Sequence, residues 1–217
     1  MIAVQDYSVD SFNSIGELHT AKEKFDTVGG DKLVEQAFLE LFRRHGVDRI
    51  FGLTMVHRHF ELNGKERLVD FQGTAVPWEE VDELNNPGIT AASWEITPQG
   101  IRPYEFKLDP ASIGAQEVDF NDPKIQAFAK EFVELTQRAG ATGLFGLCVY
   151  PGDDFESLIE TTQGRANISI PFKPFNNMKD GFVDATWFFS PKIWEARGRC
   201  VCVYNLWGNH TGHRWRG

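Results

Sequence analysis

Hydrophobic residues recur along two stretches of the chain with the spacing of an amphipathic helix. The apolar positions of the first stretch are Val34, Ala37, Phe38, Leu41 and Phe42, and those of the second are Ile125, Phe128, Ala129, Phe132 and Val133. Residues three or four positions apart lie on one face of an α-helix, so each stretch predicts a helix with one buried face. Gly46 and Gly140 follow, and glycine ends a helix easily because it adopts the left-handed conformation.

Around these helices the pattern changes to short apolar runs and alternation, which are typical of strands. Before each helix we expect a leading strand, at 21–28 and 115–120. After the first helix we expect strands within 50–62, 66–72, 91–97 and 101–108. After the second helix, the matching strands are expected within 144–150, 157–164, 184–190 and 199–206.

Several of these segments match each other in the same order. Phe-Gly-Leu occurs at 51–53 and 145–147, Gln-Gly ends the segments 68–73 and 159–164, and Trp94 and Trp187 occupy corresponding places. Ordered self-similarity indicates an internal repeat. Strands that follow a helix in runs favour an α+β fold with antiparallel sheets.

The predicted fold is therefore an internally duplicated α+β body. Each copy holds about one helix and four to five antiparallel strands, and the two copies pack as one compact unit. Residues 1–21 would form an N-terminal extension, 22–109 the first copy, and 110–217 the second copy with a histidine-containing C-terminal tail.

Composition and charge exclude some classes of partner. The formal net charge is −9, and the 22 Lys and Arg residues form no basic cluster, so we expect no nucleic acid as partner. No segment approaches the roughly 20 apolar residues of a membrane helix, and the N-terminus has no leader-like pattern, so we expect a cytoplasmic protein with no membrane association. Three cysteines without a disulfide-like spacing are consistent with reduced thiols.

The segment 56–61, VHRHFE, is the main candidate for chemistry. His57 and His59 are two residues apart, so on an extended strand their imidazoles lie on the same side and could bind one ion. A transition-metal site needs three or four ligands. The C-terminal His210 and His213 are the expected source of the others, and Glu61 would serve as a base or a further ligand.

This donor set predicts a divalent transition metal, zinc or iron. Asp70 and Cys202 are additional candidate ligands, the latter if the metal is zinc. The competing interpretation is structural, because histidines at strand ends commonly only form hydrogen bonds with the backbone. The sequence contains no phosphate-binding loop and no dinucleotide fingerprint, so no nucleotide cofactor is expected.

Three functions remain open at this level. The preferred hypothesis is a metal-dependent enzyme that acts on a small, partly apolar molecule, with the metal activating water or oxygen or polarising a carbonyl group. The alternative is a metal-free protein, either a small-molecule binder or an isomerase or lyase, with an apolar pocket between sheet and helix. The third is a structural subunit that forms a homodimer through exposed strands.

Overall fold

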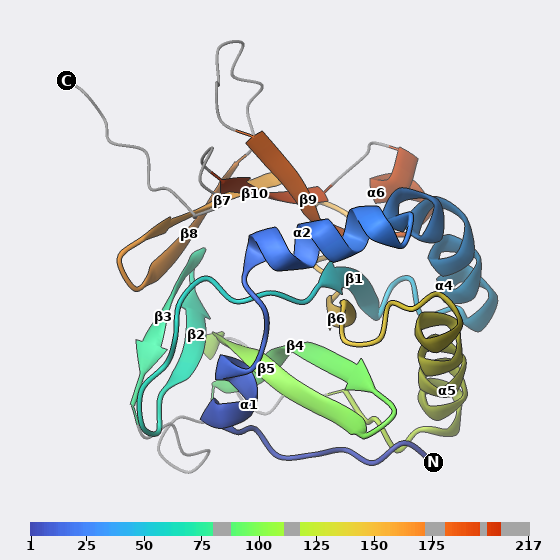
Figure 1. Cartoon of the computed structure of the whole chain (residues 1–217), viewed down its shortest axis with the longest axis horizontal. Coiled ribbons are helices and arrows are strands. Elements are labelled where there is room, and N and C mark those ends of the chain that lie inside the picture. The colour runs from blue at the N-terminus through green and yellow to red at the C-terminus, as the bar shows by residue number, and fades with distance from the viewer. Residues whose placement is uncertain (80–87, 111–117, 172–180, 196–198, 205–217) are drawn as a thin grey trace.

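The strands of the chain close into one barrel, with the helices packed against it (Figure 1). The computed structural model describes residues 1–79, 88–110, 118–171, 181–195 and 199–204. Its helices are α1 (Val9–Asn13), α2 (Leu18–Thr27), α3 (Gly30–Lys32), η1 (Leu33–Phe38), α4 (Leu39–His45), α5 (Pro123–Arg138) and α6 (Pro191–Glu195). Its strands are β1 (Phe51–Met55), β2 (Arg67–Phe71), β3 (Thr74–Trp78), β4 (Ile89–Thr97), β5 (Gly100–Leu108), β6 (Phe145–Val149), β7 (Leu158–Gln163), β8 (Ala166–Pro171), β9 (Gly181–Trp187) and β10 (Arg199–Tyr204).

The strand order mixes early and late parts of the chain. Around the barrel it runs β1-β6-β4-β5-β2-β3-β8-β7-β10-β9, and β9 pairs with β1 to close the ring. Two neighbouring pairs are parallel, β2 with β5 and β7 with β10. The other neighbours are antiparallel, so the barrel is mixed.

The predicted fold class, an α+β body made of two copies of a helix-plus-antiparallel-sheet unit, is wrong. Strand β6 lies between β1 and β4, and β3 pairs with β8, so strands that were expected to form two sheets interleave in one. Alternating hydrophobicity reports which face of a strand is buried but not which strand lies beside it. The closed mixed barrel follows from pairings between residues far apart in the sequence.

The two helices predicted from the apolar spacing are confirmed. In the first, η1 continues into α4, and the chain leaves α4 at Gly46, whose φ of 59° is left-handed. The second is α5, where the Asp122 carboxylate accepts hydrogen bonds from the backbone N–H groups of Lys124 and Ile125, and Pro123 occupies the first turn. None of the described helices is long and apolar enough to cross a membrane.

The leading strand predicted at 21–28 is wrong, because this segment belongs to α2. Leu18, Ala21 and Phe25 are the buried residues of α2, and their spacing places them on one helix face. The Phe25 ring stacks on the indole of Trp187 in β9, with centroids 5.6 Å apart. This contact fixes α2 against the barrel. The matching prediction at 115–120 falls largely outside the described residues.

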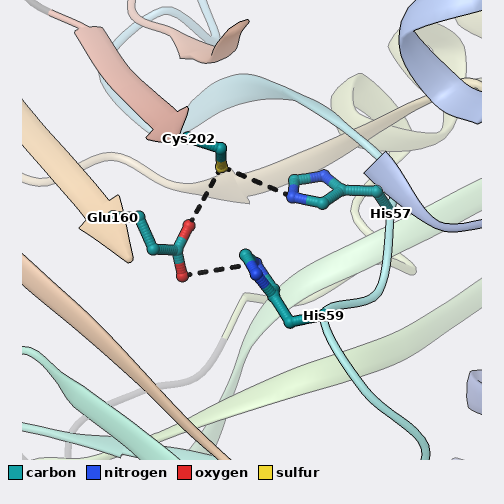
Figure 2. Close-up of side chains that lie close together, drawn as sticks. All are labelled: His57, His59, Glu160 and Cys202. Atoms are coloured by element: carbon teal, nitrogen blue, oxygen red, sulfur yellow. Dashed lines mark hydrogen bonds and ion pairs between the residues drawn. The ribbon is translucent and has the colours of Figure 1, made fainter. Parts of the chain in front are cut away.

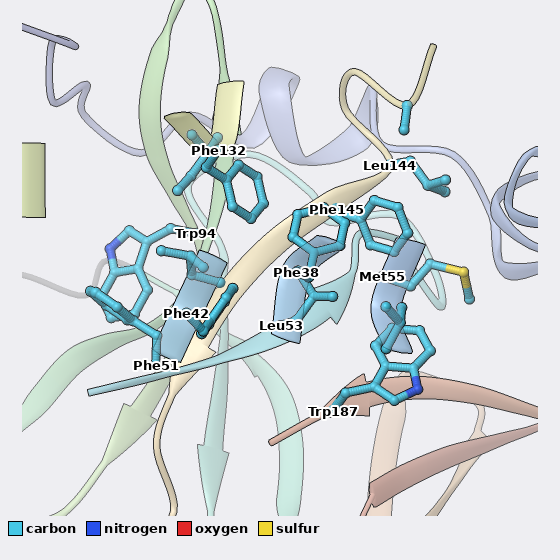
Figure 3. Close-up of a cluster of buried hydrophobic side chains, with 14 of the residues drawn as sticks. Phe38, Phe42, Phe51, Leu53, Met55, Trp94, Phe132, Leu144, Phe145 and Trp187 are labelled. Atoms are coloured by element: carbon cyan, nitrogen blue, oxygen red, sulfur yellow. The ribbon is translucent and has the colours of Figure 1, made fainter. Parts of the chain in front are cut away.

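The hydrophobic core lies between the helices and the strands β1, β4, β6 and β9 (Figure 3). Aromatic rings of η1, α4 and α5 meet those of β1 and β6, and Phe38 and Phe145 have centroids 4.8 Å apart. Phe51, Leu53 and Met55 of β1 belong to this core. Because strand side chains alternate, the residues between them turn to the other side, the inside of the barrel.

The inside of the barrel carries polar groups on its wall. Gly52 pairs with Cys148, and Cys148 pairs with Ser93, so these three residues share the face opposite to the helices. The Ser93 hydroxyl lies 2.8 Å from the Glu105 carboxylate and donates a hydrogen bond to it. A carboxyl group therefore lies inside the barrel.

Candidate metal centre

Four potential metal ligands converge from three parts of the barrel (Figure 2). His57 and His59 lie in the segment that follows β1, Glu160 lies on β7, and Cys202 lies on β10. One donor atom from each side chain lies within 4.8 Å of those of the other three. We refer to these residues as the four-residue cluster.

Strand register brings the two non-histidine members together. Strands β7 and β10 are parallel neighbours, and Cys202 is the register partner of Glu160, so their side chains lie on the same face. Strand β10 pairs with β9, which pairs with β1. The histidines just beyond the end of β1 therefore come close to β10. Strand pairing runs without a break from β1 through β9 and β10 to β7.

The four-residue cluster lies inside the barrel. The Nδ1 atom of His59, which follows β1, is 3.0 Å from Oγ1 of Thr162 on β7. Strands β1 and β7 are not neighbours in the ring. Side chains from separated strands of a closed barrel approach each other in its interior, because those on the outside diverge. The cluster is well shielded, since Cys202 is fully buried and the His59 side chain is 2% exposed.

Three contacts between these side chains have about the length expected between the ligands of a tetrahedral ion, and they use both carboxylate oxygens of Glu160. The Sγ atom of Cys202 is 3.5 Å from Nε2 of His57 and 3.4 Å from Oε2 of Glu160. The Nε2 atom of His59 is 3.5 Å from Oε1 of Glu160. Nitrogen, oxygen and sulfur ligands at their usual distances from tetrahedral zinc would be about 3.4 to 3.6 Å apart. This group of side chains could hold a metal ion.

The backbone sets the orientation of His57. Its Nδ1 atom lies 2.8 Å from the carbonyl oxygen of Met55. A carbonyl oxygen only accepts, so Nδ1 carries the hydrogen and donates it. In the neutral ring, the lone pair is then on Nε2, the atom that faces Cys202. A hydrogen bond of this kind is the usual support of a metal-binding imidazole.

Two polar residues, Thr162 and Asn167, set the orientation of the His59 imidazole. The Thr162 hydroxyl donates to Oδ1 of Asn167 across a distance of 2.9 Å, so its oxygen accepts from Nδ1 of His59. The residues Thr162 and Asn167 are register partners in β7 and β8, which places them side by side. Nε2 of His59 is thereby directed toward Glu160, in the same sense as Nε2 of His57 is directed toward Cys202.

The local charges favour a neutral His57, an anionic Glu160 and a protonated His59, and His59 must release the proton of Nε2 before it can bind a metal. Burial and the neighbouring His59 lower the pKa of His57 to about 4, so this ring is neutral at neutral pH. Burial opposes ionisation of Glu160, but His59 outweighs it and lowers the pKa of the carboxyl group to about 2. Burial also lowers the pKa of His59, and the Glu160 carboxylate reverses this, so that the pKa of His59 is raised.

A second carboxyl group belongs to the same surroundings. Burial, followed by the charge of Glu160, raises the pKa of Glu105 to about 7. Glu105 in turn helps to raise the pKa of His59. Strand β5, which carries Glu105, is not a neighbour of β7. The mutual influence of these groups is therefore exerted across the barrel interior.

The sequence located part of this cluster. His57, His59 and Cys202 were among the predicted ligands, and Glu160 was missed. The sequence gives little indication of Glu160, because a glutamate in the strand Leu158–Gln163 resembles an ordinary solvent-facing residue. Its proximity to Cys202 follows only from the pairing of β7 with β10. Predictions for His210 and His213 lie outside the described residues.

Two other candidates lie apart from the cluster. The side chain of Glu61 is 67% exposed, and its carboxylate lies 3.5 Å from the guanidinium group of Arg58. Asp70 is not one of the four converging residues. Its carboxylate accepts a hydrogen bond from the backbone N–H of Gly73, which follows β2.

Comparisons with protein-family models, with curated protein sequences and with solved structures found no match to this chain.

Proposed function

We propose that the protein binds one zinc ion through His57, His59, Glu160 and Cys202. The observation that supports this most directly is the set of donor distances of 3.4 to 3.5 Å, together with two histidines whose Nδ1 atoms are already occupied as donors. A thiolate with two imidazoles and a carboxylate offers the mixture of nitrogen, sulfur and oxygen donors that zinc accepts. The thiolate disfavours magnesium and calcium, which prefer oxygen alone.

Zinc fits the cluster better than iron. The common non-haem iron site uses two histidines and one carboxylate on one face and leaves the remaining positions open. Here Cys202 contributes a fourth protein donor at a tetrahedral distance from both His57 and Glu160. Four protein ligands match the coordination number of structural zinc, and three plus a water molecule match catalytic zinc.

We favour an enzymatic role for the ion, as a Lewis acid that polarises a small substrate. The supporting observation is that the barrel interior holds two polar residues that are not metal ligands in the proposed site, Glu105 and Asn167. A substrate oxygen would take the position of the Glu160 carboxylate, the least buried ligand at 19% exposure. Glu105 would serve as the general acid or base, because its pKa of about 7 suits proton transfer near neutral pH.

Elemental analysis of untagged protein tests the site. The parent protein should contain about one zinc per chain, and His57→Ala and Cys202→Ser should contain almost none. His19→Ala and Cys148→Ser are matched controls, because His19 is an exposed helix residue and Cys148 is a thiol on β6, which does not pair with β7 or β10. A parent protein without metal would favour the metal-free binding protein instead.

A further inference from the structure

Asn167 is a buried residue with one unsatisfied hydrogen-bonding group. Its side chain is on β8, and the residue is only 1% exposed. Its Oδ1 atom accepts a hydrogen bond from Thr162. Within the part of the chain that the structure describes, its Nδ2 atom has no hydrogen-bond partner. Buried amide groups are nearly always paired, so this N–H pair is a candidate donor to a ligand.

The orientation of the amide follows from the hydrogen count. The Thr162 hydroxyl lies 3.0 Å from Nδ1 of His59 and donates its single hydrogen to Oδ1 of Asn167, 2.9 Å away. A His59 ring that presents the lone pair of Nε2 carries its hydrogen on Nδ1, which then donates to the same hydroxyl oxygen. The reverse orientation would direct two donors at one hydroxyl and leave its hydrogen without this acceptor. The unsatisfied atom is therefore the N–H donor.

The neighbouring position on the inner wall is small. Asn167 pairs with Ala75 of β3, and Ala75 pairs with Asp70 of β2, so the three side chains lie in a row on one face. Ala75 carries only a methyl group between the two longer side chains, and it packs against the apolar cluster that includes Leu68 and Tyr104. The same face continues through Thr162 to Glu160, two residues along β7. A molecule beside Asn167 would thus also lie beside the four-residue cluster.

Burial of this wall disfavours a charged ligand. Glu160 is a carboxylate of the cluster, and Glu105 and Asp70 are two further carboxyl groups within its electrostatic range. Burial is the first cause that raises the pKa of both Glu105 and Asp70. A charged ligand would lose its hydration in the same buried surroundings. A neutral ligand with an oxygen acceptor satisfies the N–H group without that cost.

We propose that Asn167 forms a subsite that donates its Nδ2 hydrogen bond to the carbonyl oxygen of a small neutral molecule, such as an amide or ketone, held beside the four-residue cluster. The inference rests on the proposed zinc function for the chemistry that follows binding. Binding at Asn167 itself rests on the buried, unsatisfied donor and on its position beside Thr162 and the cluster.

Nuclear magnetic resonance of protein labelled with ¹⁵N-asparagine tests this subsite. Acetamide is the neutral probe, and acetate is its anionic counterpart of nearly equal size. The Asn167 signal is identified as the side-chain pair that disappears in Asn167→Asp, which keeps the acceptor for Thr162, or in Asn167→Ser should the first variant not fold. Asn13 provides an internal control, because its Nδ2 already donates to the carbonyl oxygen of Leu62 at 2.8 Å.

Acetamide should shift the Asn167 signal saturably, with at least ten-fold tighter binding than acetate, while the Asn13 signal stays in place. An unmoved Asn167 signal, or equal shifts at Asn167 and Asn13, would overturn the proposal. Acetate binding as tightly as acetamide would overturn the preference for a neutral ligand. The zinc content is measured on the same samples, so a saturable shift in metal-free protein would leave the subsite standing even if the zinc site failed.

Discussion

The Sγ atom of Cys202 lies 3.5 Å from the Nε2 atom of His57, although 145 positions separate the two residues in the chain. Three pairings between β1, β9, β10 and β7 connect these atoms and Glu160. The cluster thus brings together the segment that follows the first strand of the barrel, β1, and its last strand in the sequence, β10. An ion bound there would hold together strands that the sequence order keeps apart.

Removal of the metal should lower the melting temperature. A ligand that binds only the folded state at 1,000 times its dissociation constant stabilises a protein by about 4 kcal/mol. For a chain of this size, such a loss corresponds to roughly 8 to 16 °C. Calorimetry of the zinc-loaded protein with and without a chelator measures the difference. Cys202→Ser should show almost none, and a chelator effect equal to that of the parent would contradict the ligand assignment.

Thr162→Val should weaken zinc binding without removing a ligand. Valine has the shape of threonine but cannot accept the hydrogen bond from Nδ1 of His59, so the imidazole loses its orientation. Loss of such a supporting contact typically costs 10- to 100-fold in metal affinity. Competition with a chromogenic chelator measures this affinity. Thr20→Val is the control, because Thr20 contacts the exposed His19 on α2, and its zinc affinity should equal that of the parent.

Glu105→Gln should stabilise the protein at neutral pH. The folded-state pKa of about 7 exceeds the ordinary glutamate pKa of 4.5, so the folded state holds its proton while the unfolded state ionises. Stability due to the neutral carboxyl group is complete below pH 4.5 and declines as the pH rises to 7, by about 3 kcal/mol in total. The glutamine variant avoids this loss and keeps an oxygen acceptor for Ser93.

Denaturant unfolding of Glu105→Gln at several pH values is the corresponding measurement. The difference in unfolding free energy between variant and parent should widen between pH 4.5 and 7 and then stay level. Glu23→Gln alters an exposed carboxylate of α2 and should give a difference that does not change with pH. A pH-independent difference for Glu105→Gln would show that this carboxyl group is not buried as described.

Gly146→Ala tests the interleaved strand order. A Cβ atom at Gly146 would overlap the carbonyl oxygen of Trp94 and would also lie 2.8 Å from Cγ2 of Val56. Since Gly146 pairs with Glu95, this clash falls on the β4–β6 contact, and we expect destabilisation by about 3 kcal/mol or more. Gly16→Ala is the control, with its nearest atom at an ordinary 3.7 Å. Equal stability of the two variants would argue against the placement of β6 beside β4.

The helix of η1 and α4 and the helix α5 could be predicted because their determinants are local, whereas α2 was mistaken for a strand. The spacing of Ile125, Phe128 and Phe132 identifies the buried face of α5, and Gly46 marks the end of α4. The barrel could not be predicted in this way. A shift of register between Cys200 and Val201 in the pairing of β9 with β10 changes which way the following side chains face, and no sequence period signals it.

The candidate site was accessible to sequence analysis only in part. His57 and His59 are two positions apart in the chain, so their spacing alone suggested that they bind the same metal ion. Glu160 and Cys202 come together through the parallel pairing of β7 and β10, which joins segments that are distant in the sequence. Thr162 and Asn167 are partners in the local β7–β8 pairing, but their support of His59 depends on the approach of a segment 103 positions away, and these residues look ordinary in the sequence.

X-ray absorption at the zinc edge of the loaded protein tests the central claim most directly. The account predicts a four-coordinate ion with one sulfur neighbour at about 2.3 Å and nitrogen or oxygen neighbours at about 2.0 to 2.2 Å. In Cys202→Ser the sulfur neighbour should disappear, and in Cys148→Ser it should remain. A shell of oxygen and nitrogen alone, in the parent protein, would contradict the assignment of zinc to His57, His59, Glu160 and Cys202.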